Sequence, residues 1–143
     1  MRISTKGRYA LRILADVATN GTTKNVSIRE IAERQGISDK YLEGIVARLT
    51  AAGLLKSVRG KYGGYQLVKA PEDYNVYEIL YAAEDSIALV SCLDDDADIC
   101  PVKHECLTAP LWAHLQHEFK LSMEHVSLRD VMDQKFHSFE ENE

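Results

Sequence analysis

A capping box followed six residues later by a glycine constrains this chain more than any other feature. In Ser27-x-x-Glu30 the Ser hydroxyl can accept from the Glu30 amide while the Glu side chain returns to the Ser27 amide, so a helix begins here. Gly36 is expected to end it, because glycine most easily takes the left-handed conformation of a helix terminus. The helix is therefore short, and the chain turns sharply after it.

A second short helix follows this turn. Ser38 or Asp39 can cap it, and it ends near Gly53. The apolar positions of the two helices are Ile28, Ile31, Ala32, Leu42, Ile45, Val46 and Leu49. With a preceding helix from Thr5 to Asn20, this pattern predicts a helix-turn-helix over about 27–52. A generic helical hairpin has a similar pattern.

A glycine-rich hairpin comes next. Leu54 to Arg59 and Tyr65 to Val68 are short strand-like runs, separated by the segment Gly60-Lys61-Tyr62-Gly63-Gly64. A glycine-rich tip that carries a cation and an aromatic side chain is typical of a wing. Residues 1–70 are therefore predicted to form a winged helix-turn-helix domain, with the wing at about 55–68.

The charge of the chain is divided between its halves. Residues 1–69 hold 13 Lys and Arg against 5 Asp and Glu, a net charge of +8, and residues 70–143 hold 4 against 17, a net charge of −13. This pattern is expected when one half of a protein contacts a polyanion, so we expect the first half to bind double-stranded DNA. Two solvated faces without a partner are the alternative.

The remaining residues, 71–143, are expected to alternate between helices and one irregular loop. Asn75-x-x-Glu78 opens a helix, whereas residues 84–107 show no helical or strand periodicity. Ser127 begins a last short helix, and the tail from His137 is acidic.

A long amphipathic helix is expected from Thr108 to about His125. One side of it carries Leu111, Leu115, Phe119, Ser122 and Val126, with Trp112 alongside. This stripe can fold back on its own core or pair with a second chain. We favour a homodimer, because winged-helix proteins commonly bind two symmetric half-sites. The expected fold is mainly α, with a small β-hairpin wing and a long C-terminal dimerisation helix.

All three cysteines of the chain, Cys92, Cys100 and Cys106, fall in the loop at 84–107. Their odd number, without an export signal, argues against a disulfide framework and favours a soft-metal site or a redox switch. Zinc sites favour cysteines separated by about two to four residues, whereas the longer gaps here suit an iron–sulfur cluster. Since a cluster usually has about four protein ligands, the fourth must be nitrogen, oxygen, a small molecule or a ligand from the second subunit.

Four segments carry motifs that occur in a recognisable order. They are Met1–Ala10, Ile31–Glu43, Val58–Tyr65 and Cys106–Trp112. Together they resemble the bacterial IscR/CymR/NsrR superfamily of winged-helix repressors over nearly the whole chain. The resemblance implies a homodimer held by the long C-terminal helix, with the cysteine loop near that helix and close to the partner's DNA-binding domain.

The resemblance also implies a cofactor. Members with three cysteines in this loop hold an iron–sulfur cluster, [2Fe-2S] or [4Fe-4S], and report iron–sulfur status, iron supply or nitric oxide. Members of the cysteine-metabolism branch lack these cysteines and respond to a protein partner. This chain has the three cysteines.

The chain differs from the family that it resembles at the positions that would supply the fourth ligand. The IscR branch places a His three residues after the last cysteine, where this chain has Ala109. The nitric-oxide branch can use a carboxylate of the partner chain, but the corresponding residue here is Arg8. His104 is the nearest nitrogen in the loop and is our candidate, and acidic residues of the loop or an open coordination site are the alternatives.

The residues expected to contact DNA come from three places. They are Ser38, Lys40, Tyr41 and Glu43 in the second helix of the motif, Arg59, Gly60, Lys61 and Tyr62 in the wing, and Arg2, Lys6 and Arg8 at the start of the first helix. Glu43 can accept a hydrogen bond from cytosine N4, and the resemblance implies that a Glu here contributes to operator discrimination. An exposed carboxylate without a target is the alternative.

We therefore expect a dimeric transcriptional regulator, a repressor whose operator affinity is set by an iron–sulfur cluster. The alternative is a thiol-redox or zinc-dependent winged-helix regulator of cysteine or sulfur metabolism. An electron carrier is disfavoured because it needs no wing. The sequence has no recognisable nucleotide-phosphate loop, nucleophile–base pair, secretory signal or membrane-spanning stretch, so we expect a cytoplasmic protein that is not an enzyme.

Overall fold

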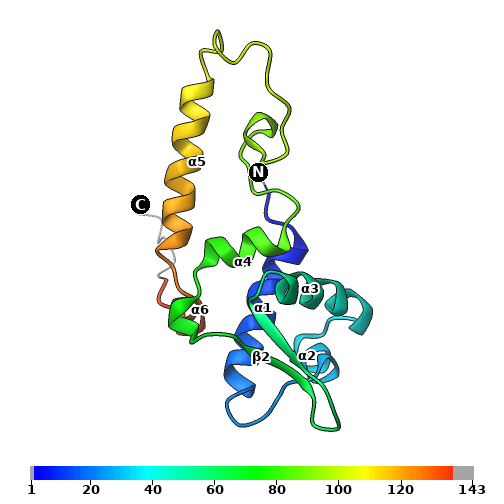
Figure 1. Cartoon of the computed structure of the whole chain (residues 1–143). Coiled ribbons are helices and arrows are strands. Elements are labelled where there is room, and N and C mark those ends of the chain that lie inside the picture. The colour runs from blue at the N-terminus through cyan, green and yellow to red at the C-terminus, as the bar shows by residue number, and fades with distance from the viewer. Residues whose placement is uncertain (1, 137–143) are drawn as a thin grey trace.

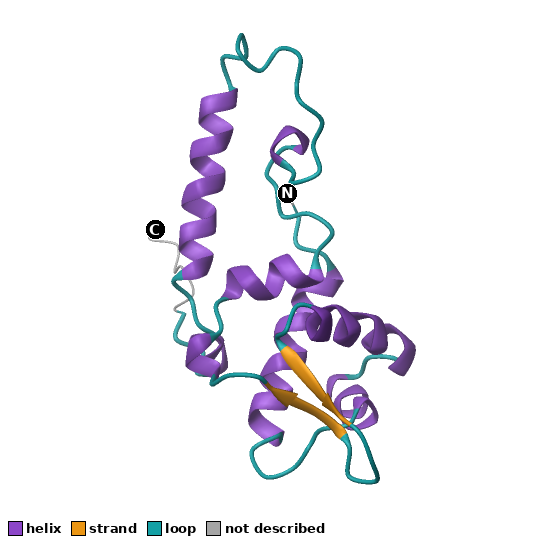
Figure 2. Cartoon of the chain, in the orientation of Figure 1, coloured by secondary structure: helices purple, strands orange, loops and turns teal. Residues whose placement is uncertain are grey.

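The computed structural model describes residues 2–136, so the acidic tail predicted from His137 lies outside it. In chain order the elements are α1 (Thr5–Asn20), α2 (Ile28–Gln35), α3 (Asp39–Ala51), β1 (Leu55–Val58), β2 (Gly64–Leu67), the 3-10 turn η1 (Pro71–Asp73), α4 (Val76–Ala83), the 3-10 turn η2 (Ser91–Leu93), α5 (Ala109–Glu124) and α6 (Leu128–Met132). The fold is mainly helical with one two-stranded hairpin, which confirms the predicted winged helix-turn-helix (Figure 2).

The helix ends follow the capping residues of the sequence. Both halves of the predicted box at Ser27 are formed, and Gly36 adopts the left-handed conformation with φ 65°. Ser38, not Asp39, caps α3, because its hydroxyl accepts a hydrogen bond from the backbone N–H of Tyr41. Local hydrogen bonds therefore determine where α2 ends and α3 begins.

The hydrophobic core lies where α1 packs against α2, α3 and α4 (Figure 1). Its buried side chains from the first half include Ala10, Ile13, Leu14, Val17, Ile31, Leu42, Ile45, Val46, Leu49 and Leu55. Tyr74, Ile79, Ala83 and Leu128 join the same core from the second half. The core therefore extends past residue 70, and α4 and α6 help to hold the helix-turn-helix.

The hairpin is a short antiparallel pair with register Leu55↔Leu67 to Val58↔Gly64. A backbone bridge between Val26 and Tyr65 attaches it to the segment that precedes α2. The wing is thus fixed at its base to the helix-turn-helix.

The helix α5 projects away from this core, and residues 84–107 form an arch from the end of α4 to the start of α5 (Figure 1). Apart from η2, the arch has no helix or strand, as predicted. No helix of the described chain is both long and apolar enough to cross a membrane.

Candidate DNA-binding face and cysteine loop

The start of α3 presents its predicted DNA contacts to solvent. Ser38, Lys40, Tyr41 and Glu43 are all exposed, while Leu42, Ile45 and Leu49 point into the core. The Tyr41 ring meets the Tyr9 ring of α1 edge to face, with centroids 5.9 Å apart. This contact holds one aromatic side chain of the exposed face in place.

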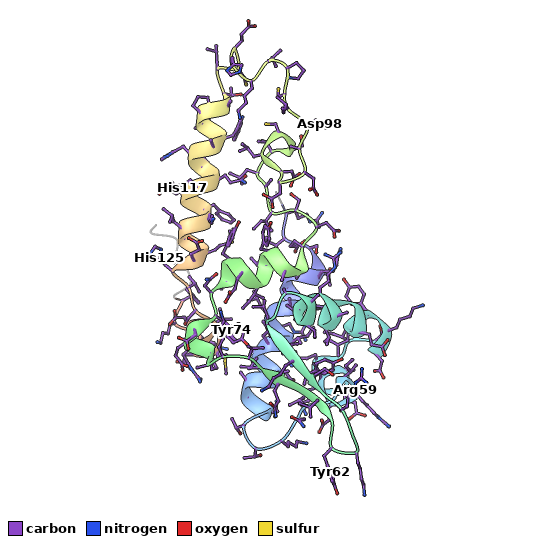
Figure 3. The ribbon with its side chains drawn as sticks, in the orientation of Figure 1. Arg59, Tyr62, Tyr74, Asp98, His117 and His125 are labelled. Atoms are coloured by element: carbon purple, nitrogen blue, oxygen red, sulfur yellow. The ribbon has the colours of Figure 1, made fainter. Side chains whose placement is uncertain are left out.

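The predicted wing residues lie at the end of β1 and in the tip of the hairpin. Arg59, Gly60, Lys61 and Tyr62 are exposed, and Tyr62 extends from the tip of the hairpin with 82% of its surface accessible (Figure 3). The Lys61 ammonium lies 5.5 Å from the centroid of the Tyr62 ring. The tip therefore carries a cation and an aromatic ring that face solvent together.

The predicted DNA contacts at the start of α1 differ in the contacts that their side chains make within the fold. Arg2 is exposed, and Arg8 donates to the hydroxyl of Thr5 at 3.3 Å. Lys6 instead forms an ion pair with Asp85, with 2.8 Å between Nζ and Oδ2. The structure thus ties Lys6 to the beginning of the cysteine loop.

Ion pairs within the fold engage much of the basic charge of residues 1–69. The paired cations are Lys6, Lys24, Arg29, Arg34, Arg48 and Lys69. Within residues 2–136, the cations of this half that form no ion pair are Arg2, Arg8, Arg12, Lys40, Lys56, Arg59 and Lys61. The charge available to a polyanion therefore comes from α1 and the residues before it, from the start of α3 and from the wing hairpin.

The residues Glu84 and Asp85, which follow α4, form a junction that sequence reasoning missed. One carboxylate oxygen of Glu84 accepts from the backbone N–H groups of Ser4 and Gly7, at 2.8 and 3.2 Å. Glycine at position 7 permits this approach, because a Cβ would collide with that oxygen. Glu84 therefore satisfies free amides in the first turn of α1.

Asp85 connects α1 to the end of α3. It pairs with Lys6 at 2.8 Å and with Arg48 at 2.6 Å, and Arg48 also donates to the carbonyl of Ala83. The hydrogen bonds from Lys6 and Arg48 lower the pKa of Asp85 to about 2. We call Glu84 and Asp85 the loop junction, because they join the cysteine loop to α1 and α3.

The three cysteines of the loop are free thiols in different surroundings. Cys92 is exposed in η2, whereas Cys100 and Cys106 are half-buried. The hydroxyl of Thr108, with the backbone N–H groups of Thr108 and Ala109, lowers the pKa of the Cys106 thiol. This environment favours the thiolate, the form that binds soft metals.

The ligand types in the loop fit an iron–sulfur cluster, but their arrangement does not yet bring them together. Within the part of the chain that the structure describes, no three His, Cys, Asp or Glu side chains gather closely enough to hold a metal ion. His104, the candidate fourth ligand, is exposed in the same arch. Binding of a shared group by these thiols therefore requires the arch to close.

The first part of the arch is already attached to α4 and α5. Ser86 donates to Asp94, Tyr81 of α4 donates to Asp95, and Gln116 of α5 accepts from the backbone N–H of Leu89 at 2.8 Å. Asp94 and Asp95 are therefore engaged with the protein itself.

The apolar stripe of α5 remains exposed. Leu111, Leu115 and Phe119 expose 49%, 41% and 39% of their surface, and Trp112 is half-buried. Of the two predicted alternatives, the stripe does not fold back on the core of its own chain. It forms an apolar surface that is free to meet another molecule.

Comparison with known proteins assigns the chain to a family. Residues 3–134 match the family described as Rrf2, iron-dependent transcriptional regulator. The protein rrf2 of Nitratidesulfovibrio vulgaris is 39% identical over 132 residues, which cover 92% of this chain and 87% of that protein.

Two solved structures share the fold. CymR, the global cysteine regulator of B. subtilis, superimposes with a TM-score of 0.72 at 34% identity, covering 94% of this chain and 98% of CymR. IscR of T. potens gives the same TM-score at 32% identity, covering 95% of this chain and 89% of IscR. The chain belongs to the Rrf2 family of DNA-binding transcriptional regulators, which are not enzymes.

Proposed function

We propose that this protein is a homodimeric repressor in the cytoplasm, and that an iron–sulfur cluster on Cys92, Cys100 and Cys106 sets its affinity for a two-fold symmetric DNA operator. The observation that carries the proposal is the position of the thiols. All of them lie in one arch, and the loop junction attaches the start of that arch to both α1 and α3.

The exposed start of α3 supplies the sequence readout in this proposal. In a helix-turn-helix, the N-terminal part of the second helix enters the major groove. Lys40 can contact phosphate or a base edge there, and the Glu43 carboxylate can accept from cytosine N4. Arg59, Lys61 and Tyr62 of the wing, with Arg2, contact the backbone or the minor groove.

The α5 stripe supplies the dimer contact. Two copies that bury Leu111, Leu115 and Phe119 against each other remove from water the apolar surface that α5 exposes in one chain. The two recognition helices then read half-sites whose centres lie about 10–10.5 bp apart, or a multiple of that distance.

The cysteine loop supplies the sensor. Three thiolates with His104, or with one open coordination site, hold the cluster, and a bound cluster supplies a group whose stability depends on iron, oxygen or nitric oxide. The loop must change shape to gather these ligands. Because Asp85 contacts both Lys6 and Arg48, such a change alters the contacts at the start of α1 and the end of α3.

A second candidate function is a cluster-free regulator that senses oxidants through its thiols or binds zinc. The lowered pKa of Cys106 favours it, since a thiolate is the form that reacts with oxidants. The equal structural likeness to CymR, a cysteine regulator, also supports it.

Purification without oxygen separates the two functions. The proposed function predicts visible absorbance with stoichiometric iron and sulfide, and loss of both when any of the three cysteines is replaced by Ser. His104→Ala is the comparison variant: loss of cluster stability identifies the fourth ligand, and unchanged stability favours the open site. A colourless protein with zinc, or with no metal, contradicts the cluster and leaves the second candidate.

Two substitutions test the assignment of the DNA face. The probes are duplexes that the wild-type protein enriches from a randomised pool. Lys61→Ala should weaken binding to all of them about equally and reduce the salt dependence by about one phosphate contact. Glu43→Gln should change which sequences are preferred. If both substitutions only scale affinity equally on every sequence, the readout is assigned incorrectly.

A further inference from the structure

The wing hairpin is attached to the segment that precedes α2 through its base. At its base, the hairpin is attached to Val26 by two backbone hydrogen bonds, from Val26 N to Tyr65 O at 3.1 Å and from Tyr65 N to Val26 O at 2.7 Å. Gly64 allows this close approach, because a Cβ at that position would lie 2.6 Å from the Val26 carbonyl oxygen. These bonds fix the strands but do not reach the tip.

Asn25 extends the attachment to the tip. Its Nδ2 donates to the carbonyl oxygen of Tyr62 at 2.8 Å, and its Oδ1 accepts from Nε2 of Gln66 in β2. Within the described residues, this is the one hydrogen bond that reaches the tip, residues 60–63, from outside the hairpin. A single half-buried side chain in the loop between α1 and α2 therefore connects that loop to both the tip and the strand.

The glycines of the tip give it a large conformational freedom, which a contact from outside the hairpin can restrict. Gly60 has φ 115°, and glycines at positions 63 and 64 follow within the same turn. Glycine loses more conformational freedom on ordering than any other residue. A tip without an external contact must lose that freedom when it binds, and this loss lowers affinity.

We propose that Asn25 is a positioning residue for DNA recognition. It does not touch DNA, and it holds the Tyr62 carbonyl so that Lys61 and Tyr62 are already placed for contact in the free protein. The inference rests on the proposed contact between the wing and DNA and adds a residue that this contact depends on.

A double-mutant cycle tests the inference with the full-length protein and the enriched duplexes. Asn25→Ala removes the hydrogen bonds to Tyr62 and from Gln66, and it should weaken binding by about three- to tenfold, the effect expected when the tip loses its one external hydrogen bond. In a Lys61→Ala/Tyr62→Ala background the same change should have almost no effect, because the tip no longer contributes. Amide hydrogen exchange at residues 60–63 should become faster in Asn25→Ala while exchange in α3 stays unchanged.

The control variant is Thr23→Ala, since Thr23 lies in the same loop and is exposed. It should leave both affinity and exchange unchanged. The inference is overturned if Asn25→Ala binds like the wild type, or if it loses the same factor in both backgrounds. If instead Lys61→Ala/Tyr62→Ala itself binds normally, then the wing does not contact DNA, and the proposed function fails at that point as well.

Discussion

The winged helix-turn-helix domain and the cysteine loop are built in different ways within one chain. In the first region, the capping side chains of Ser27 and Ser38 begin α2 and α3, and the apolar face of each helix is buried in a common core. In the loop, Ile99 and Leu107 expose 92% and 96% of their surface, and one 3-10 turn is the regular structure. The first region is therefore determined by contacts within the chain, whereas much of the loop is exposed, and in the proposed function a ligand or a second subunit supplies further contacts to it.

The largest expected effect contrasts one leucine from each region. Leu14→Ala removes a fully buried side chain of α1 and should lower the free energy of unfolding by about 2–5 kcal/mol. Leu107→Ala removes an exposed side chain of the loop and should change it by less than about 0.5 kcal/mol in the cluster-free protein. Urea unfolding measures both. A comparable loss in the two variants would show that the loop is packed as firmly as the core.

The α5 stripe combines a property of each region, since it is helical like the domain but exposed like the loop. Leu115→Glu should weaken dimerisation by about 3 kcal/mol or more, because it buries an unpaired charge in the proposed interface. His117→Glu, an exposed change on the same helix outside the stripe, is the matched control. Sedimentation equilibrium measures the effect. A dimer that is equally stable in both variants must use another surface.

A smaller effect tests the capping of α2. Hydrogen bonds from Lys24 and from the backbone N–H of Ser27 lower the pKa of Glu30 from 4.5 to about 2. Because the folded-state pKa lies below that of the unfolded chain, this stabilisation is complete above about pH 4.5 and is lost as the pH falls toward 2. Glu30→Gln should therefore cost about 1 kcal/mol at neutral pH and almost nothing near pH 2.

Urea unfolding at a series of pH values measures this dependence. Glu33→Gln is the control, because its carboxylate is exposed on the same helix and pairs with Arg29 alone. A difference between Glu30→Gln and the wild type that stays constant across the pH range would argue against the carboxylate as the source.

A small effect on stability is expected at the loop junction, where the two regions meet. Asp85 is 71% exposed, so Asp85→Asn should cost less than about 1 kcal/mol of unfolding free energy. It should nevertheless reduce the ratio of operator affinities between cluster-loaded and cluster-free protein by about threefold, since it removes the contacts to Lys6 and Arg48. Asp96→Asn, an exposed change within the loop, should leave this ratio unchanged. An unaltered ratio in Asp85→Asn would place the coupling elsewhere.

Much of the first region could be predicted from local sequence. The bounds of α1, the box at Ser27 and the turn at Gly36 were predicted correctly, because each depends on side chains within a few residues of the helix end. The strands were also identified, and their ends differ from prediction by a single residue. The choice between Ser38 and Asp39 needed the structure, since either side chain can cap a helix.

Contacts between distant parts of the chain could not be predicted. Glu84 and Asp85 lie about 80 residues from their partners in α1, and no local pattern marks such a pair. The same is true of Asn25, whose partner Tyr62 lies 37 residues away. The predicted DNA contact at Lys6 shows the consequence, because its charge is paired within the fold and only the structure could reveal that partner.

The sequence by itself determined the type and order of the elements, the separation of charge between the halves, and the gathering of every thiol in one loop. These features depend on helix capping, hydrophobic periodicity and composition, which act over short distances along the chain. The tertiary structure alone decided which cations remain free, which residues join the cysteine loop to α1 and α3, and what holds the wing tip. Those contacts depend on distances in space, and the chain acquires them only when the core brings its halves together.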